Sequence, residues 1–226
     1  MLAGCGGKKE AEPSTTTTAP RTVRVYLLLH GKVQPVARTV SETKDLPVAA
    51  VAELVERPTV GERELGLVSA VDEIEGLVVS GRVAHVPGFD RHSLAQIVYT
   101  LTQFSTVKRV EMSGKAYTRK DLEDLTPAIL VESPLPEQGV SRPLRVTGTA
   151  NTFEATFQYE LLDSTGKVVA KHFVTATSGS GTRGTFDVTI PYPSRHGGPG
   201  TLVVYESSAK DGSRINVVPI PVTLAN

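Results

Sequence analysis

The stretch "HSLAQIVYTLTQF" at residues 92–104, with "VKRVEM" at 107–112 behind it, decides the fold of the first half of the chain. Its apolar residues recur at helical spacing and would form one stripe along a helix. These residues are Leu94, Ile97, Val98, Leu101 and Phe104. The second stretch has strand character. A helix with one apolar face followed by a strand predicts an α+β layer, in which helices cover a sheet.

The residues before this helix extend the pattern. Residues 22–29, "TVRVYLLL", alternate in polarity as a half-buried strand does, and residues 34–40 form a second strand after a turn at Gly31. A helix is predicted from Pro47 to the stop at Pro58. Residues 76–86 read as two strands about a Ser80-Gly81 turn. The predicted order over residues 21–117 is therefore β-β-α-β-β-α-β.

Several stretches of this segment resemble the GerMN domain of sporulation and spore germination. The resemblance covers nearly all of residues 21–117, and its most specific part is "AQIVYTLTQFSTVKRV" at residues 95–110. One departure is Arg57, where the family more often has Gly. The resemblance implies an extracytoplasmic module of the bacterial envelope with a fold like that of ring-building domains, and it brings no catalytic residues.

The second half has a different pattern. After a polar stretch whose residues 118–126 are interpreted as a linker with one helical turn, residues 127–226 hold seven short apolar strands separated by Gly, Pro, Asp and Ser. Residues 161–169, "LLDSTGKVV", are typical of a hairpin with its turn at 164–166. Seven strands in about 100 residues predict an immunoglobulin-like β-sandwich.

This half resembles the immunoglobulin-like domain that accompanies bacterial spore germination proteins. The stretches that carry the resemblance are "SPLP", "PLRVTGTA" and "YESSAKDGS". The resemblance implies recognition in the bacterial envelope or in germination, but it does not imply a specific biochemical function.

Cys5 is the single cysteine of the chain, and it follows Leu2-Ala3-Gly4. This resembles the lipobox of bacterial lipoproteins, although a free terminal cysteine is the alternative. Residues 1–20 have the composition of a disordered tether. We therefore expect Cys5 to be lipidated and the chain to be anchored on the outer face of the bacterial cytoplasmic membrane. That hypothesis requires a signal peptide encoded upstream of Met1, because residues 1–4 have none.

Charge and motifs exclude several functions. The 24 basic and 24 acidic residues balance, so the footprint of a nucleic-acid binder is missing. The histidines show no metal-binding spacing, and no hydrolase motif occurs, so we expect no metal, no cofactor and no catalytic residue. His85, Asp90 and His92 are interpreted as a polar loop before a helix rather than an acid/base group. Residues 62–64 are interpreted as a solvated loop.

Two residues remain as weak candidates for a ligand loop. Arg183 follows a glycine-rich connection at residues 177–182 whose amides could hold a carboxylate or sugar oxygen, and Asp211 precedes Gly212 in a hairpin turn. A plain strand connection is the alternative for the first. The functional hypothesis is a non-enzymatic, lipid-anchored module that binds envelope proteins or itself. The alternative is a lipoprotein that binds cell-wall glycan or peptide.

Overall fold

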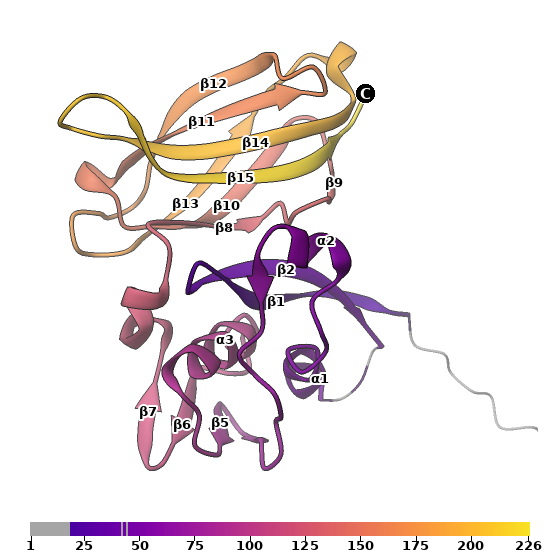
Figure 1. Cartoon of the computed structure of the whole chain (residues 1–226), viewed down its shortest axis with the longest axis vertical. Coiled ribbons are helices and arrows are strands. Elements are labelled where there is room, and N and C mark those ends of the chain that lie inside the picture. Colours follow the sequence, from indigo (N-terminus) through magenta and orange to yellow (C-terminus); the bar gives the residue numbers. More distant parts are fainter. Residues whose placement is uncertain (1–18, 42, 44) are drawn as a thin grey trace, which may run out of the picture.

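The computed structural model describes residues 19–41, 43 and 45–226. It has two parts, each with its own apolar core (Figure 1). The first is a mixed α+β domain and the second is an all-β, immunoglobulin-like domain, so the predicted fold class is confirmed. Cys5 and the rest of the predicted tether up to residue 18 lie outside the described residues.

The first domain contains two small sheets and three α-helices. One sheet has the order β2-β1-β3, and the other has the order β4-β5-β6-β7. The elements are β1 (Arg21–Leu29), β2 (Lys32–Val40), α1 (Leu46–Ala52), α2 (Val60–Glu64), β3 (Leu67–Val68), β4 (Val78–Ser80), β5 (Val83–Val86), α3 (Arg91–Leu101), β6 (Arg109–Met112) and β7 (Lys115–Tyr117).

The β1–β2 hairpin turns at His30 and Gly31, whose φ angles of 50° and 74° both lie in the left-handed region. Two such residues make the tight turn that suits the twist of a hairpin, and Asn or Gly usually fills the first position. In this chain His30 fills the first position of the turn, at the tip of the hairpin.

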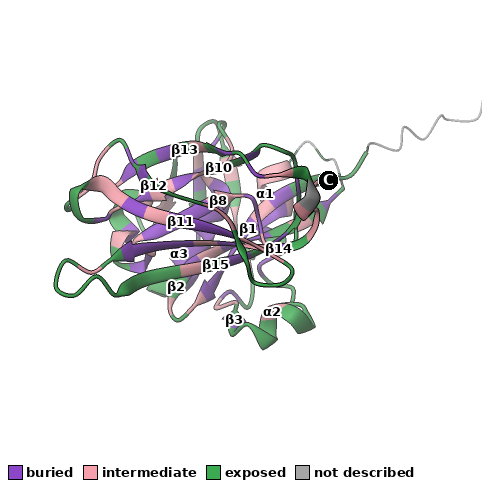
Figure 2. Cartoon of the chain, turned by 90° about the horizontal axis from the view of Figure 1, so that it is seen from above, coloured by how far each residue is buried: buried purple, intermediate pink, exposed green. Residues whose placement is uncertain are grey.

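Helix α3 lies in the core and is buried from Ser93 to Leu101 (Figure 2). Its N-terminus is capped by Asp90, whose carboxylate accepts from the backbone N–H groups of His92 and Ser93. The predicted apolar stripe is confirmed, except that Phe104 lies beyond the helix and is only partly buried.

The polar residues of α3 are buried too, because they replace a missing neighbour of strand β1. The Gln96 side chain donates to the carbonyl of Tyr26 at 2.9 Å and accepts from the N–H of Ala70 at 2.7 Å. The Thr100 hydroxyl accepts from the N–H of Tyr26 at 3.1 Å, and the Gln103 amide accepts from Arg24 at 2.9 Å. Side chains of α3 and of the turn that follows it thus satisfy backbone groups that a strand would otherwise pair.

Two predictions about residues 47–64 are wrong. Helix α1 ends at Ala52, well before Pro58, and Val55 of the predicted apolar face is exposed. Residues 62–64 belong to the short helix α2, not to a solvated loop. Glu62 caps this helix through Thr59 and forms a bidentate ion pair with Arg38, at 2.7 and 2.8 Å. The capping box and the ion pair together hold Glu62 against β2. The run of charged residues in the sequence does not predict these contacts.

The segment between the domains forms the 3-10 helix η1 (Arg119–Leu125). Leu122 and Leu125 are buried in the core of the first domain. Strand β8 follows and is shared by both cores, because Leu130 packs into the first core while its neighbours Ile129 and Val131 pack into the second. This shared strand ties the two domains together.

The second domain is a sandwich of two sheets with the orders β13-β10-β8 and β12-β11-β14-β15-β9. All seven predicted strands are present, and the short β9 is an addition. Their bounds are β8 (Ile129–Ser133), β9 (Gly139–Val140), β10 (Leu144–Ala150), β11 (Thr156–Asp163), β12 (Val168–Thr175), β13 (Gly184–Ile190), β14 (Gly198–Ser207) and β15 (Arg214–Leu224). Two further short 3-10 turns are η2 (Phe153–Ala155) and η3 (Ser194–His196). The predicted hairpin joins β11 to β12.

Candidate functional site

Two arginine–glutamate pairs cross the boundary between the domains. In the first, Arg119 of η1 donates to the carboxylate of Glu132 on β8 at 2.7 Å. The same guanidinium donates to the Thr102 hydroxyl at 2.8 Å and to the Tyr99 carbonyl at 3.1 Å, and it lies over the Tyr99 ring at 4.6 Å. Several donors of one planar group are therefore used at once, which fixes its orientation.

The hydroxyl of Tyr26 donates to the same carboxylate oxygen of Glu132. Burial raises the pKa of Tyr26 above its ordinary value. Burial would also raise the pKa of Glu132, but the Arg119 charge and the Tyr26 hydroxyl outweigh it and hold that pKa below its ordinary value. Glu132 is thus an ionised carboxylate that joins the first domain's strand β1 and helix η1 to the sandwich.

The second pair runs in the opposite direction. Arg183, at the start of β13, donates to both carboxylate oxygens of Glu123 on η1 at 2.8 and 2.9 Å. It also donates to the Pro127 carbonyl at 2.8 Å, and Asn151 donates to Glu123 at 2.9 Å. Burial would raise the pKa of Glu123, but the Arg183 hydrogen bonds lower it. Helix η1 therefore provides the cation of the first pair, Arg119, and the carboxylate of the second pair, Glu123.

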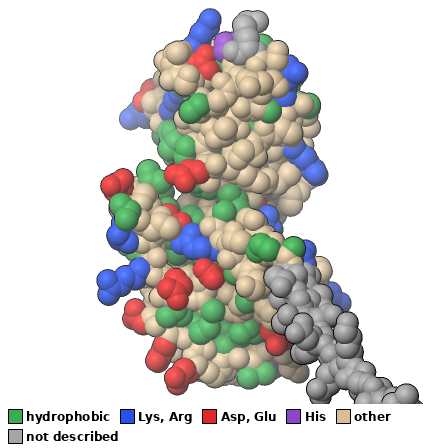
Figure 3. All heavy atoms as spheres, turned by 90° about the vertical axis from the view of Figure 1, so that its right-hand side faces the viewer, with side chains coloured by type: hydrophobic (Ala, Val, Ile, Leu, Met, Phe, Trp, Pro, Cys, Tyr) green, Lys and Arg blue, Asp and Glu red, His purple; other side chains and the backbone are tan. Residues whose placement is uncertain are grey.

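A cleft of about 890 Å³ lies between the two domains, and Arg183 and Glu123 of the second pair line it. Figure 3 shows hydrophobic side chains gathered at the junction of the two lobes. The first domain contributes Leu29, Val33, Leu65 and Leu67, and the sandwich contributes Pro136, Val217, Val218, Pro219 and Pro221. The volume lies within the range of small-molecule and peptide-side-chain sites, so this cleft is the candidate functional site.

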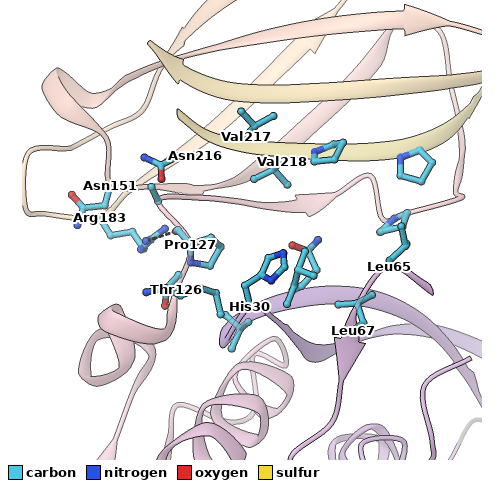
Figure 4. Close-up of a pocket in the computed structure, with 18 of the residues that line it drawn as sticks. His30, Leu65, Leu67, Thr126, Pro127, Asn151, Arg183, Asn216, Val217 and Val218 are labelled. Atoms are coloured by element: carbon cyan, nitrogen blue, oxygen red, sulfur yellow. Dashed lines mark hydrogen bonds between the residues drawn. The ribbon is translucent and has the colours of Figure 1, made fainter. Parts of the chain in front are cut away.

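The close-up in Figure 4 shows how the two walls of the cleft face each other. His30 projects from the β1–β2 hairpin toward the segment of β15 that holds Asn216, Val217 and Val218. Leu65 and Val217 are 58% and 47% exposed, large fractions for apolar side chains that line a hollow. Contiguous exposed apolar surface of this kind marks binding sites.

The charges around the cleft do not cancel. Lys32 lines it and donates to the Asp124 carbonyl. The nearby carboxylates are already paired, Glu123 with Arg183 and Asp124 with Arg91. Among the described residues that line the cleft, Lys32 and Arg183 are cations and Glu123 is the carboxylate, so the lining itself carries one more positive than negative group.

The structure separates the two residues predicted as a ligand loop. Arg183 does bind a carboxylate, but this carboxylate belongs to Glu123 of the same chain. Asp211 lies in the β14–β15 hairpin, where it accepts from the backbone N–H and the hydroxyl of Ser213 at 3.0 and 2.7 Å, and it does not line the cleft. A ligand role for either residue stays a prediction.

Of the three residues interpreted as a polar loop before a helix, only Asp90 lies in the loop, because His85 belongs to β5 and His92 to α3. Asp90 is the helix cap, and His85 lies 3.5 Å from Glu111 on the neighbouring strand β6. Over residues 19–41, 43 and 45–226, no group of three or more metal-ligating side chains occurs. Within the same ranges, no helix has the length and hydropathy needed to cross a membrane.

Sequence reasoning missed the ion pairs that join the domains, including Glu123, which lines the cleft. Arg119, Glu123 and Glu132 lie in a stretch interpreted as polar linker and strand, where charged residues usually face solvent. One signal was available: Leu122 and Leu125 recur at a spacing of three in that stretch, which is typical of a helical turn with a buried side.

Two family models match separate stretches of the chain. Residues 24–114 match the model of a family described as sporulation and spore germination. Residues 128–213 match the model of the immunoglobulin-like domain of bacterial spore germination. No curated protein sequence matches the chain.

Two solved structures are similar to parts of the chain. One holds the tandem GerMN domains of the sporulation protein GerM from Bacillus subtilis, with 24% identity and a TM-score of 0.32 over 48% of this chain and 43% of that one. The other is CopC from Methylosinus trichosporium OB3b, with 16% identity and a TM-score of 0.30 over 43% of this chain and 91% of that one. The chain thus spans less than half of the GerM structure.

Proposed function

Because the chain joins a sporulation and spore germination domain to an immunoglobulin-like domain of bacterial spore germination, we propose that it is a non-enzymatic protein-interaction module of the bacterial cell envelope. The observation that carries this proposal is the apolar cleft between the two domains, which the Arg183–Glu123 pair lines at one end. A cleft held open by fixed walls loses little freedom when a partner binds.

The side chains that could do chemistry have structural tasks instead, which supports a binding role. Asp90 caps α3, and Glu62 caps α2 while it pairs with Arg38. Asp163 and His196, 3.0 Å apart, close the β11–β12 hairpin region against η3. Each of these groups is engaged by neighbours that hold the fold.

The proposal includes a lipid anchor at Cys5 on the outer face of the cytoplasmic membrane. The support is the Leu-Ala-Gly-Cys motif, with residues 6–20 as the tether to β1. Two or more acyl chains give stable anchoring, at about 0.8 kcal/mol for each buried CH2 group.

The anchor is tested by expression from the natural gene start, followed by mass spectrometry of the N-terminal peptide. An acylated Cys5 in the membrane fraction, with release of the Cys5→Ala variant into the soluble fraction, is the expected result. An unmodified Cys5 would refute the anchor and leave the interaction role to its own test.

The interaction role is tested by crosslinking in intact cells. A reproducible protein neighbour, or a second copy of the chain, is expected in the crosslinked product. Recovery with wall fragments alone would replace this proposal with cell-wall binding. The Arg145→Met chain serves as a control, because it breaks only an exposed ion pair with Asp187 on the sandwich and should crosslink like the unaltered chain.

A further inference from the structure

We propose that the cleft between the two domains binds an extended peptide segment that carries apolar side chains and a carboxylate, with the carboxylate next to Lys32. The proposal rests on the interaction role above and names the class of partner. Its argument uses the lining of the cleft, the strand edges that border it and the charge at one end.

The lining indicates an apolar partner. The exposed Leu65 and Val217 face the cleft from opposite domains, above the buried Leu67 and beside the half-buried Val218. Covering such side chains removes apolar surface from water and favours binding by about 25 cal/mol for each Å². The lining includes no Phe, Tyr or Trp. Sugar rings, which stack on aromatic faces, would have no platform here.

Neutral polar groups at the rim match a peptide backbone. Gln34 and Asn216 lie on opposite walls, and their amides can both donate and accept. Among the described residues, the Gln34 and His30 side chains make no hydrogen bond, and Asn216 uses only its amide nitrogen, toward Glu206. A peptide in the cleft could use these groups, whereas an acyl chain has no polar atoms to offer them.

The strand edges that border the cleft restrict how the peptide is held. Pro219 and Pro221 of β15 have no N–H to give, and the Pro221 carbonyl already accepts from Glu137. Pro35 has the same effect on β2, the edge strand of its sheet. Prolines at strand edges prevent the addition of a further strand. The peptide is therefore anchored by its side chains in the cleft, not by extending either sheet.

The surplus positive charge selects a carboxylate. Glu123 in the lining is already paired with Arg183. Lys32 forms no ion pair within 4.0 Å with any described residue, although its charge also acts on Glu123 and Asp124. His30 lies two residues away at the tip of the same hairpin and adds a hydrogen-bond donor or acceptor. An acidic side chain or a free C-terminal carboxylate would complete this end of the cleft.

The test selects a phage-displayed library of random peptides on the full chain. The consensus peptide is then synthesised with a fluorophore, and its affinity is measured by anisotropy. We expect sequences with apolar residues and an acidic residue or a C-terminal carboxylate. Val217→Asp should weaken binding by about tenfold or more because it places a charge against the apolar contact. Lys32→Gln should weaken binding by about three- to tenfold, with the loss reduced at high salt.

Matched controls are available at similar exposed positions away from the cleft. Val168→Asp on β12 and Lys108→Gln before β6 should leave the affinity unchanged. Equal losses in the controls, peptides insensitive to Val217→Asp, or no selected peptide would each overturn the proposal. Binding of dodecanoate with the same sensitivity, and no peptide binding, would assign the cleft to an acyl chain instead. If the Val217→Asp chain still crosslinks its cellular neighbour, the cleft proposal fails while the interaction role stands.

Discussion

The guanidinium of Arg119 lies 2.7 Å from the carboxylate of Glu132, so a helix of one domain is paired with a strand of the other. Both side chains are mostly buried, at 26% and 16% exposed. An ion pair of this kind contributes little net stability, yet removing one partner is costly because the other charge stays buried. The pair therefore fixes how the domains are oriented.

Arg119→Met is expected to lower the free energy of unfolding by up to about 3 kcal/mol, since Glu132 would remain as a buried charge. Urea unfolding measures this loss. The control is Arg145→Met, whose partner Asp187 is exposed on the sandwich surface, and it should cost less than about 1 kcal/mol. Equal costs for the two variants would show that Glu132 is not confined.

Strong alkali should expose the buried hydroxyl of Tyr26. Its pKa is raised by burial above the ordinary 10.0, so the folded chain keeps the proton where the unfolded chain releases it. The stability that Tyr26 contributes is complete below about pH 10 and falls as the pH rises further. Tyr26→Phe is expected to be less stable near pH 7, by about 1–3 kcal/mol for the lost hydrogen bond, and to lose less on going to pH 11.

Urea unfolding at several pH values between 7 and 11 checks this difference. Tyr117→Phe, on the outer strand β7, is the control. A parallel decline in Tyr26→Phe and the unaltered chain would contradict the assignment of alkaline instability to Tyr26.

Replacing Gln96 should damage the fold without touching the apolar core. Gln96→Leu keeps a similar size but leaves the Tyr26 carbonyl and the Ala70 N–H unpaired. Each buried group without a partner costs about 1–3 kcal/mol, so we expect a loss of about 2 kcal/mol or more. Thermal or urea unfolding measures it, with Gln34→Leu on β2, whose side chain makes no hydrogen bond among the described residues, as the control. If Gln96→Leu were as stable as the unaltered chain, water would have to supply the hydrogen bonds that the Tyr26 carbonyl and the Ala70 N–H lose.

The β11–β12 hairpin should lose an acid-resistant contact when Asp163 is replaced. The Thr165 hydroxyl, the backbone N–H groups of Thr165 and Lys167, and His196 together lower the pKa of Asp163 to about 2. Its contribution to stability is therefore complete above about pH 4 and is lost as the pH falls toward 2. Asp163→Asn should show a smaller loss of melting temperature between pH 5 and pH 2 than the unaltered chain.

Asp72→Asn, at an exposed position of the first domain, is the control for that experiment and should follow the unaltered chain. Identical acid profiles for Asp163→Asn and the unaltered chain would show that the hairpin does not depend on the ionised carboxylate.

Most strands of both domains could be predicted from the sequence because their alternation and turn residues are local signals, whereas the short β3, β7 and β9 were missed. The polar residues of α3 and of the turn after it show where this reasoning stops. Gln96, Thr100 and Gln103 have the spacing of a solvent-facing stripe, but they cap the edge of β1, far away in the sequence. A polar pattern does not reveal whether water or a backbone supplies the partner.

The candidate site could not be predicted for a related reason. The Arg183–Glu123 pair joins residues 60 positions apart, and the walls of the cleft come from both domains. The neighbouring residues in "TSGSGTRGTF" do not show whether the arginine binds a ligand or pairs with a carboxylate of the same chain. The domain limits 21–117, 118–126 and 127–226 stay a prediction from composition, and η1 shows that the middle segment packs with the first domain.

Helix η1 lies in the interval that neither family match covers, between residue 114 and residue 128. It nevertheless holds one partner of each ion pair that joins the domains. A recombination event that exchanged either domain for a relative would separate Arg119 from Glu132, or Glu123 from Arg183, unless the new domain brought the matching charge. Chimeras that preserve η1 with both partners should therefore retain the native arrangement of the two domains.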